Sequence, residues 1–217
     1  IRDRTMGAGQ FCTNPGVVLA LKGEAFTALQ NAAITALNAS PAQKMLTDGI
    51  HSAYHSGVSA LSKHATEVTG GQRADTPRHS HAAAFRVDAD TWLKTPALHH
   101  EVFGAAGVFV ECDDAQQMKD VAQELEGQLT ITLQMDDGDT ALAKEFLPIV
   151  EEKAGRLLCN GFPTGVEVCS AMMHGGPYPA STDSRSTSVG TLAITRWLRP
   201  VAYQNFPTDL LHDDLTP

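Results

Sequence analysis

The stretch from Gly107 to Leu125, "GVFVECDDAQQMKDVAQEL", contains the pattern that decides the fold. Its first half is a short continuous apolar run, which is typical of a buried strand. Its second half carries Met118, Val121 and Leu125 at helical spacing. The aspartates between the halves can cap the amino end of a helix. The stretch therefore predicts one strand followed directly by one helix.

The same unit occurs on both sides of this stretch. Upstream, residues 17–21 form an apolar run, and residues 23–38 repeat apolar positions at helical spacing. Downstream, residues 128–135 alternate like a strand, residues 139–155 have a helical pattern, and residues 156–160 again resemble a strand. Repeated strand–helix units predict an α/β fold, in which a parallel sheet is covered by helices on both faces.

Two further segments complete the expected organisation. Ser40 and Pro41 predict the N-cap and first position of a helix whose apolar stripe ends at Leu61. Residues 191–207, "TLAITRWLRPVAYQNFP", resemble a strand that Pro200 confines to a sheet edge or a bulge. Since an exposed edge strand must be paired or protected, we expect this strand to pair outside the main sheet, with another chain.

Composition excludes several classes of partner. The chain has 217 residues, 42% of them hydrophobic and 19% charged, as in an ordinary globular protein. Its formal net charge of −9 would repel nucleic acid and anionic membranes, so neither is an expected partner. No apolar run approaches the roughly 20 residues that span a bilayer. Four scattered cysteines without a C-x-x-C pair favour a reducing, cytoplasmic location.

One of these cysteines, Cys12, lies in the glycine-rich segment "GAGQFCTNPG", residues 7–16. A thiol in such a loop is within reach of a substrate, and exposed backbone amides there can hold an oxyanion. The alternative is that Cys12 is a small hydrophobic residue buried beside Phe11, as most cysteines are. The residues alone leave both readings open.

Three motifs, in order along the chain, resemble the aldehyde dehydrogenase superfamily. "GQFCTNPG" is similar to its catalytic-cysteine segment, and "HHEVFGAAG" to its Glu-x-Phe-Gly-Pro signature. "LCNGFPTG" with "HGGPYPASTDSRSTSVGT" resembles its third signature, an asparagine followed by a loop with a Gly-Gly pair. The amino-acid sequences of these motifs most resemble those of the branch that contains the 2,5-dioxopentanoate (α-ketoglutarate semialdehyde) dehydrogenases. This branch also includes NADP-linked bacterial fatty-aldehyde enzymes.

The resemblance implies a role for each matching residue. Cys12 would attack an aldehyde, and a thiohemiacetal and a thioester would lead to the carboxylic acid, with NAD or NADP as the cofactor. Glu101 would hold the nicotinamide ribose, and Phe103 would contact the nicotinamide end. Asn160 would support the loop that walls the active site. The substrate would be an aldehyde, such as the semialdehyde 2,5-dioxopentanoate.

The chain departs from the superfamily pattern in two respects. Ala105 stands where the second signature has proline, which could loosen the loop behind Glu101. Only eleven residues precede Cys12, whereas the cofactor domain, the general base and a second oxyanion donor of the superfamily lie upstream. No G-x-G-x-x-G segment occurs either.

We therefore expect the C-terminal catalytic portion of a longer enzyme, inactive alone. Residues 1–188 would form the catalytic domain, and residues 189–217, here called the tail, would carry an oligomerisation strand. The cofactor-binding domain would be absent from this chain. The intact enzyme would be a dimer or tetramer.

Local chemistry adds two candidates. His174 could take the thiol proton or activate the hydrolytic water, unless it only bonds backbone. Arg185 could bind a substrate carboxylate, although an exposed loop arginine is the more common situation. His51 and His55 have metal-ligand spacing but lack a third ligand nearby, so they indicate an exposed helix face, and no metal site is predicted.

Two other functions remain open at this point. Cys12 and His174 could serve a cofactor-free cysteine hydrolase or acyltransferase, although no third residue that orients the histidine is identifiable. Alternatively, the chain could be a non-enzymatic module that assembles with other chains through its edge strand.

Overall fold

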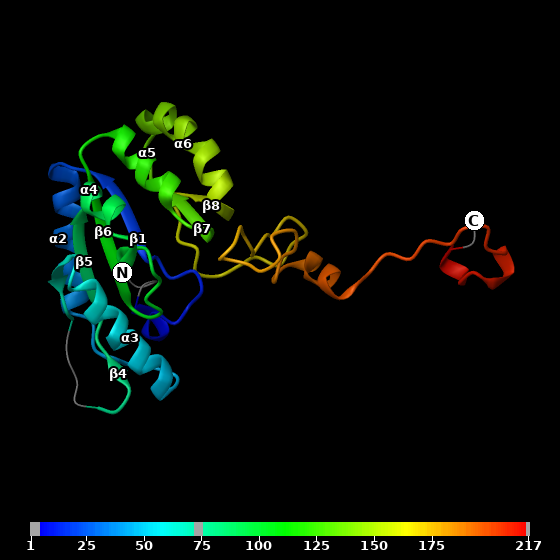
Figure 1. Cartoon of the computed structure of the whole chain (residues 1–217), viewed down its shortest axis with the longest axis horizontal. Helices are drawn as coiled ribbons and strands as arrows, with labels where there is room; N and C mark the ends of the chain where they lie inside the picture. The colour runs from blue at the N-terminus through cyan, green and yellow to red at the C-terminus, as the bar shows by residue number, and fades with distance from the viewer. Residues whose placement is uncertain (1–4, 72–75, 216–217) are drawn as a thin grey trace.

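The computed structural model describes residues 5–71 and 76–215 of the chain (Figure 1). Its central sheet has four strands in the order β1-β6-β5-β3. These strands are β1 (Val17–Leu21), β6 (Ala106–Cys112), β5 (Ala83–Asp88) and β3 (Thr66–Thr69). β1 and β5 each pair with β6 in parallel, and β3 pairs with β5 in antiparallel orientation.

Two smaller sheets accompany the central one. The parallel pair β7 (Gln128–Leu133) and β8 (Ala154–Cys159) forms a second sheet. The antiparallel pair β2 (Gln43–Lys44) and β4 (His79–Ser80) forms a third. The α-helices are α2 (Glu24–Asn38), α3 (Asp48–Leu61), α4 (Ala89–Lys94), α5 (Ala115–Glu124) and α6 (Thr140–Lys153).

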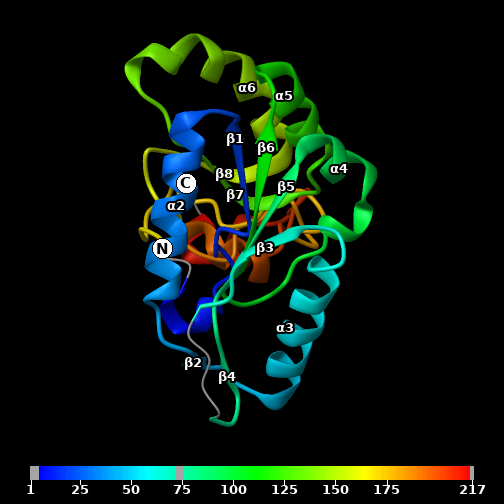
Figure 2. The ribbon, with the colours of Figure 1, turned by 90° about the vertical axis from the view of Figure 1, so that its left-hand side faces the viewer.

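Helices cover both faces of the central sheet, as the repeated strand–helix units predict. Side chains of a strand alternate between its two faces, so neighbouring residues of β5 and β6 enter different cores. Phe85 and Val110 pack in one cluster with Trp92 of α4 and with α5. Phe109 packs in the other cluster with Phe26 of α2. Figure 2 shows α2 and α4 on opposite sides of the sheet.

The predicted α/β class is therefore confirmed, but the sheet is mixed rather than wholly parallel. The antiparallel strand is β3, which is four residues long and shifts register between Glu67 and Thr69. The central strand β5 was not among the strands that we predicted. It begins with alanines, which have little strand preference of their own, and its buried position comes from pairing with β3 and β6.

The predicted start of the second helix at Ser40 and Pro41 is wrong. The Ser40 hydroxyl instead donates to the carbonyl of Ala36, at the end of α2. Residues 43 and 44 pair with β4, which interrupts any helix there. α3 begins at Asp48, and Thr47 caps it by accepting a hydrogen bond from the backbone N–H of Ile50.

The tail does not form the predicted strand. Residues Thr191–Trp197 are a 3-10 helix, and residues 198–207 have no regular secondary structure. The N–H of Thr191 donates to the carbonyl of Cys169 at 3.3 Å, and beyond Trp197 Figure 1 shows the segment extending away from the body. A strand requires a partner strand for its N–H and C=O groups, and the described residues supply none for residues 198–207.

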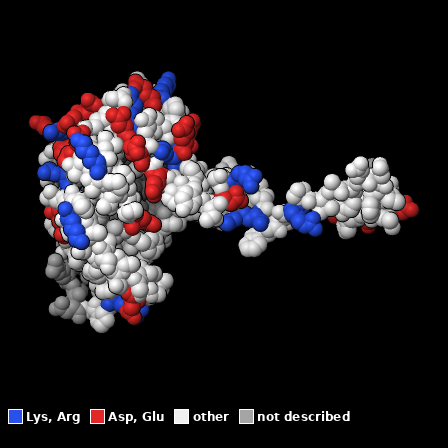
Figure 3. Space-filling model, in the orientation of Figure 1, with Lys and Arg blue, Asp and Glu red and all other residues white. Residues whose placement is uncertain are grey.

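The surface agrees with the composition. Figure 3 shows acidic side chains interspersed with basic ones over the visible face of the body, and basic side chains along the extended tail. One of the ion pairs links Lys119 of α5 to Glu145 of α6 at 2.7 Å. Across residues 5–71 and 76–215, no helix combines the length and hydrophobicity needed to cross a membrane.

Candidate active site

Cys12 lies in a loop that is fixed against the amino end of β6. The loop follows the 3-10 turn Met6–Gly9, and Gly9 has φ +70°. A Cβ on Gly9 would lie 2.4 Å from the backbone nitrogen of Ala105, a distance that no side chain tolerates. The glycine-rich sequence therefore lets the first motif touch the second one directly.

Side-chain amides hold this loop at further points. The Gln10 amide donates to the carbonyl of Gly7 at 2.8 Å and accepts from the N–H of Leu46 at 2.9 Å. The Asn14 amide nitrogen donates to the carbonyl of Gly104 at 2.6 Å. Asn14 thus ties the segment after Cys12 to the Glu-Val-Phe-Gly motif, a link that the sequence analysis missed.

His174 lies beside Cys12, although 162 residues separate them in sequence. The Nε2 atom of His174 is 3.3 Å from the sulfur of Cys12. Cys12 is exposed, whereas the His174 side chain is buried. The structure therefore places an accessible thiol within hydrogen-bonding distance of an imidazole that is shielded from solvent.

The segment that carries His174 crosses the second sheet at very short distance. A Cβ on Gly176 would lie 2.4 Å from the carbonyl oxygen of Gln128 in β7. A Cβ on Gly155 of β8 would lie 2.2 Å from the carbonyl oxygen of Gly175. The Gly-Gly pair after His174 is thus required by close backbone packing, which explains its place in the third motif.

Hydrogen bonds fix the backbone of His174 from the other side. Its N–H donates to the Thr187 hydroxyl at 2.8 Å. Its carbonyl accepts from the N–H and the hydroxyl of Ser188, at 3.0 and 2.9 Å. The serine- and threonine-rich stretch of the motif therefore fixes the backbone of His174 through the hydrogen bonds of Thr187 and Ser188.

The environment keeps His174 neutral. Burial lowers the pKa of its imidazole below the usual value, and the nearby charge of Arg156 lowers it further. A neutral imidazole whose Nε2 lacks a proton can accept the proton of the Cys12 thiol. In that tautomer Nδ1 carries the proton, and Nδ1 is buried with no hydrogen-bond partner among the described residues.

Cys12 opens into a cleft of about 470 Å³ at the junction of the central sheet and the β7–β8 sheet. Asn14, Glu101 and Phe103 line this cleft with Cys12. Glu101 and Phe103 are exposed, and the side-chain oxygen of Asn14 is buried with no partner in the described part of the chain. The structure thus gathers the nucleophile candidate and the two candidate cofactor residues around one opening.

The other two candidate residues lie elsewhere. Asn160 follows β8 and forms two hydrogen bonds of 2.8 Å with the backbone of Met135. It therefore joins the loops after β7 and β8. Arg185 has a side chain that is 94% exposed, is 3.8 Å from the Asp183 carboxylate, and is outside the set of described residues lining the cleft.

Searches of known proteins identify close relatives of the sequence. The chain is 50% identical over 213 residues to alpha-ketoglutaric semialdehyde dehydrogenase 2 of Azospirillum brasilense, covering 97% of this chain and 41% of the relative. It is 43% identical, again over 213 residues, to alpha-ketoglutaric semialdehyde dehydrogenase of Acinetobacter baylyi, covering 97% of this chain and 40% of that protein. The chain thus spans about two fifths of the length of these curated relatives. No family model matches the chain.

Solved structures give the same answer for the fold. The putative methylmalonate-semialdehyde dehydrogenase of Sinorhizobium meliloti, determined with NAD, aligns with a TM-score of 0.72 at 17% identity, covering 89% of this chain and 40% of that one. The 1-pyrroline-5-carboxylate dehydrogenase from Thermus, with bound NAD, aligns with a TM-score of 0.66 at 17% identity. The alignment covers 81% of this chain and 34% of that one.

The fold is that of solved aldehyde dehydrogenases. The sequence relatives confirm the predicted resemblance to that superfamily. Within it, the sequence is similar over almost its whole length to the alpha-ketoglutaric semialdehyde dehydrogenases, so the predicted branch is confirmed as well.

Proposed function

We propose that the protein contributes the catalytic cysteine of a dehydrogenase that oxidises an aldehyde to a carboxylic acid with NAD or NADP. The substrate is a semialdehyde such as 2,5-dioxopentanoate, in keeping with the relatives at 50% and 43% identity. The observation that carries the proposal is the Cys12 sulfur, exposed at the cleft and 3.3 Å from a neutral imidazole.

The chemistry begins at the sulfur. The thiol proton passes to Nε2 of His174, and the thiolate adds to the carbonyl carbon, which gives a thiohemiacetal with the oxygen as an oxyanion. The N–H of Cys12 has no hydrogen-bond partner among the described residues and would donate to that oxyanion. Once the thiohemiacetal has lost its hydride to a bound NAD(P)+, water would cleave the resulting thioester to release the acid and restore the thiol.

The cleft suits the nicotinamide end of a dinucleotide. The Glu101 carboxylate accepts hydrogen bonds and would bind the ribose hydroxyls, while the exposed ring of Phe103 offers an apolar contact. The unpartnered oxygen of Asn14 provides one more acceptor at the same opening. When bound, the nicotinamide accepts the hydride that converts the thiohemiacetal to the thioester.

Asn160 would support this site indirectly, since it fixes the loop after β7 to the end of β8. Arg185 faces solvent beside Asp183 in this structure. It would bind a substrate carboxylate only after its loop moved toward the cleft.

The tail would give the intact enzyme its oligomeric state. Trp197 is 87% exposed, and several other large apolar side chains of the tail are exposed with it. An extended segment with free backbone groups and exposed apolar side chains would become a strand by pairing with another copy. Light scattering tests this, and a mass of one chain for the complete enzyme contradicts it.

The proposed activity is tested by nicotinamide reduction with a short semialdehyde. The 217-residue chain is compared with a longer protein that also includes the region equivalent to the uncovered part of the relatives. We expect activity in the longer protein and little in the chain alone, because the described residues offer a site only for the nicotinamide end. Absence of activity in both contradicts the proposal.

Replacement of His174 by alanine is expected to slow alkylation of Cys12 at neutral pH and to remove the low-pH part of its profile. The reason is that the proton acceptor is lost, whereas the lowered pKa of His174 keeps its imidazole neutral to a lower pH than an ordinary histidine. A reduction of about a hundredfold in rate corresponds to the lower end of the usual effect of a general base. The measurement is the rate of iodoacetamide labelling against pH.

His212→Ala is the matched control, because this exposed histidine lies in the tail, away from the cleft. An unchanged labelling profile in His174→Ala would show that the imidazole does not act as the base for Cys12.

The cofactor-free hydrolase remains a second candidate, because the Cys12–His174 pair needs no nicotinamide. Against it, Nδ1 of His174 lacks the partner that orients the histidine of a catalytic triad. Hydrolysis of an activated ester by the chain alone, at the same rate with and without NAD(P), would favour this candidate.

A further inference from the structure

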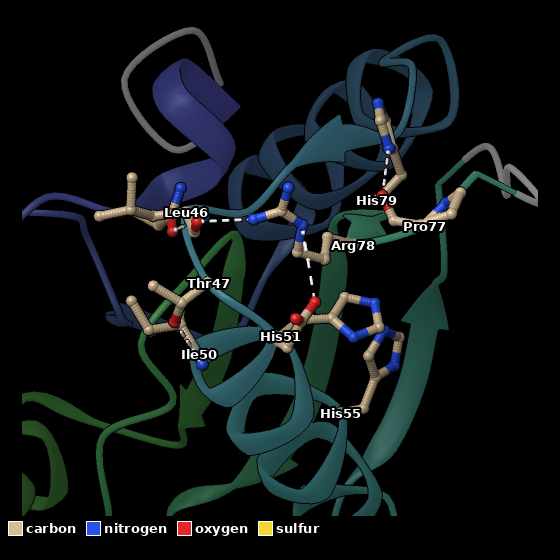
Figure 4. Close-up of polar contacts among 10 residues, drawn as sticks. Leu46, Thr47, Ile50, His51, His55, Pro77, Arg78 and His79 are labelled. Atoms are coloured by element: carbon tan, nitrogen blue, oxygen red, sulfur yellow. Dashed lines mark hydrogen bonds and ion pairs between the residues drawn. The ribbon is translucent and has the colours of Figure 1, made fainter.

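A second group of functional side chains lies on α3, outside the cleft. His51 and His55 are four residues apart on the helix, and Figure 4 shows their imidazole rings side by side. Their Nε2 atoms are 3.2 Å apart, and their ring centroids 4.5 Å apart. They line a shallow depression together with Ser52, Ser56 and Ser59.

The separation of the two nitrogens matches that of two ligands on one ion. Imidazole nitrogens lie about 2.0–2.1 Å from a bound Zn²⁺, so a separation of 3.2 Å corresponds to a ligand angle of roughly 100°, near the tetrahedral value. The distance between the two nitrogens is therefore compatible with both of them binding one ion. The pair also lies on one face of the helix, as residues four apart do.

The neighbouring strand completes the site. The hydroxyl of Ser80, in β4, is 3.2 Å from Nε2 of His55, the same atom that faces His51. His81 lies farther away, with its ring centroid 6.2 Å from that of His55. Among the described residues no third His, Cys, Asp or Glu joins the group, so water would occupy the remaining positions.

The charged groups nearby are already engaged. Arg78 lies 3.5 Å from the Asp48 carboxylate and donates to the carbonyl of Leu46 at 3.0 Å (Figure 4). His79 has its Nδ1 atom 3.1 Å from the carbonyl of Pro77.

Burial and the proximity of His51 lower the pKa of His55, which favours the neutral form that binds metals.

We propose that His51 and His55 form a chelate site for a divalent transition-metal ion, with the Ser80 hydroxyl at its edge. Neutral imidazoles bind Zn²⁺, Ni²⁺ and Cu²⁺ well, whereas Mg²⁺ and Ca²⁺ prefer oxygen ligands. An anion is disfavoured at this place, because it would require two positively charged imidazolium rings with nitrogens 3.2 Å apart, which would repel each other. The site is separate from Cys12 and independent of the proposed reaction.

Ni²⁺ is the probe of choice for the test, because the chain also has free thiols that Zn²⁺ would bind. The Cys12→Ser form of the chain is used throughout, since Cys12 and His174 also place a sulfur and an imidazole 3.3 Å apart. We expect stoichiometric binding of one Ni²⁺ by calorimetry. His51→Ala and His55→Ala should each weaken it at least about tenfold, since even residues that only support a metal ligand cost that much.

His64→Ala is the matched control and should bind Ni²⁺ like the parent, because this exposed histidine lies just beyond the end of α3. Circular dichroism verifies that each variant folds. A second measurement needs no substitution at the site: paramagnetic Ni²⁺ should broaden the ring proton signals of His51 and His55 before those of the other histidines. No stoichiometric binding of Ni²⁺, or equal binding after His51→Ala and His55→Ala are combined in one variant, would overturn the proposal.

Discussion

Aldehyde oxidation is expected to be abolished when Cys12 is replaced by serine in the complete enzyme. A serine hydroxyl is a far weaker nucleophile at neutral pH than a thiol, and His174 alone does not compensate for this. Removal of the nucleophilic serine of subtilisin lowers kcat about a millionfold, and we expect a loss of at least about a thousandfold here. The measurement is nicotinamide reduction with a short semialdehyde, together with labelling of the remaining thiols.

Cys159→Ser provides the control for this prediction. Cys159 is also a free, exposed thiol, but it lies at the end of β8, outside the described lining of the cleft. This variant should retain its activity. If Cys12→Ser oxidised the aldehyde as fast as Cys159→Ser, Cys12 would not be the nucleophile and the proposed function would have to be abandoned.

Replacement of Gly9 by alanine is expected to lower the free energy of unfolding by about 2–4 kcal/mol, the sum of the left-handed conformation and the steric overlap. Both causes are present at this residue. Its φ is +70°, and a Cβ at this position would lie 2.4 Å from the backbone nitrogen of Ala105. The loop must then move away from β6. We therefore expect slower alkylation of Cys12 as well, and urea denaturation with a labelling assay measures both effects.

Gly16→Ala is the matched control in the same loop. No atom lies within 4 Å of a Cβ on Gly16, and its φ is outside the left-handed range. Its effect on stability should be within about 0.5 kcal/mol, as for other surface substitutions. Equal losses in the two variants would mean that glycine at position 9 is not required by the contact with Ala105.

The parts of the fold that could be predicted are those with strong local patterns. β1 with α2, β6 with α5, and β7 with α6 and β8 each show a strand or helix period within a few residues of their final bounds. β5 shows no such period, because its place depends on the neighbours that pair with it. The start of α3 was misplaced because Ser40 and Pro41 are good helix-starting residues, but the pairing of β2 with β4 competes with them.

Prediction of the site followed the same division. Cys12, Glu101 and Phe103 could be chosen from their motifs, and the structure gathers them around one cleft. The contact of Cys12 with His174 was only a possibility, because no local pattern reports a distance across 162 residues. Asn14 was missed since its role is a hydrogen bond to the backbone of Gly104, and a backbone acceptor leaves no trace in the sequence.

The thiol and the imidazole are carried by different sheets. The loop of Cys12 is anchored on the central sheet through Ala105, whereas the segment of His174 is anchored on β7 and β8 through Gly155 and Gly176. Their separation of 3.3 Å is therefore a gauge of how the two sheets are aligned. A small rotation of one sheet against the other would change this distance, so the labelling rate of Cys12 would report the relative alignment of the two sheets.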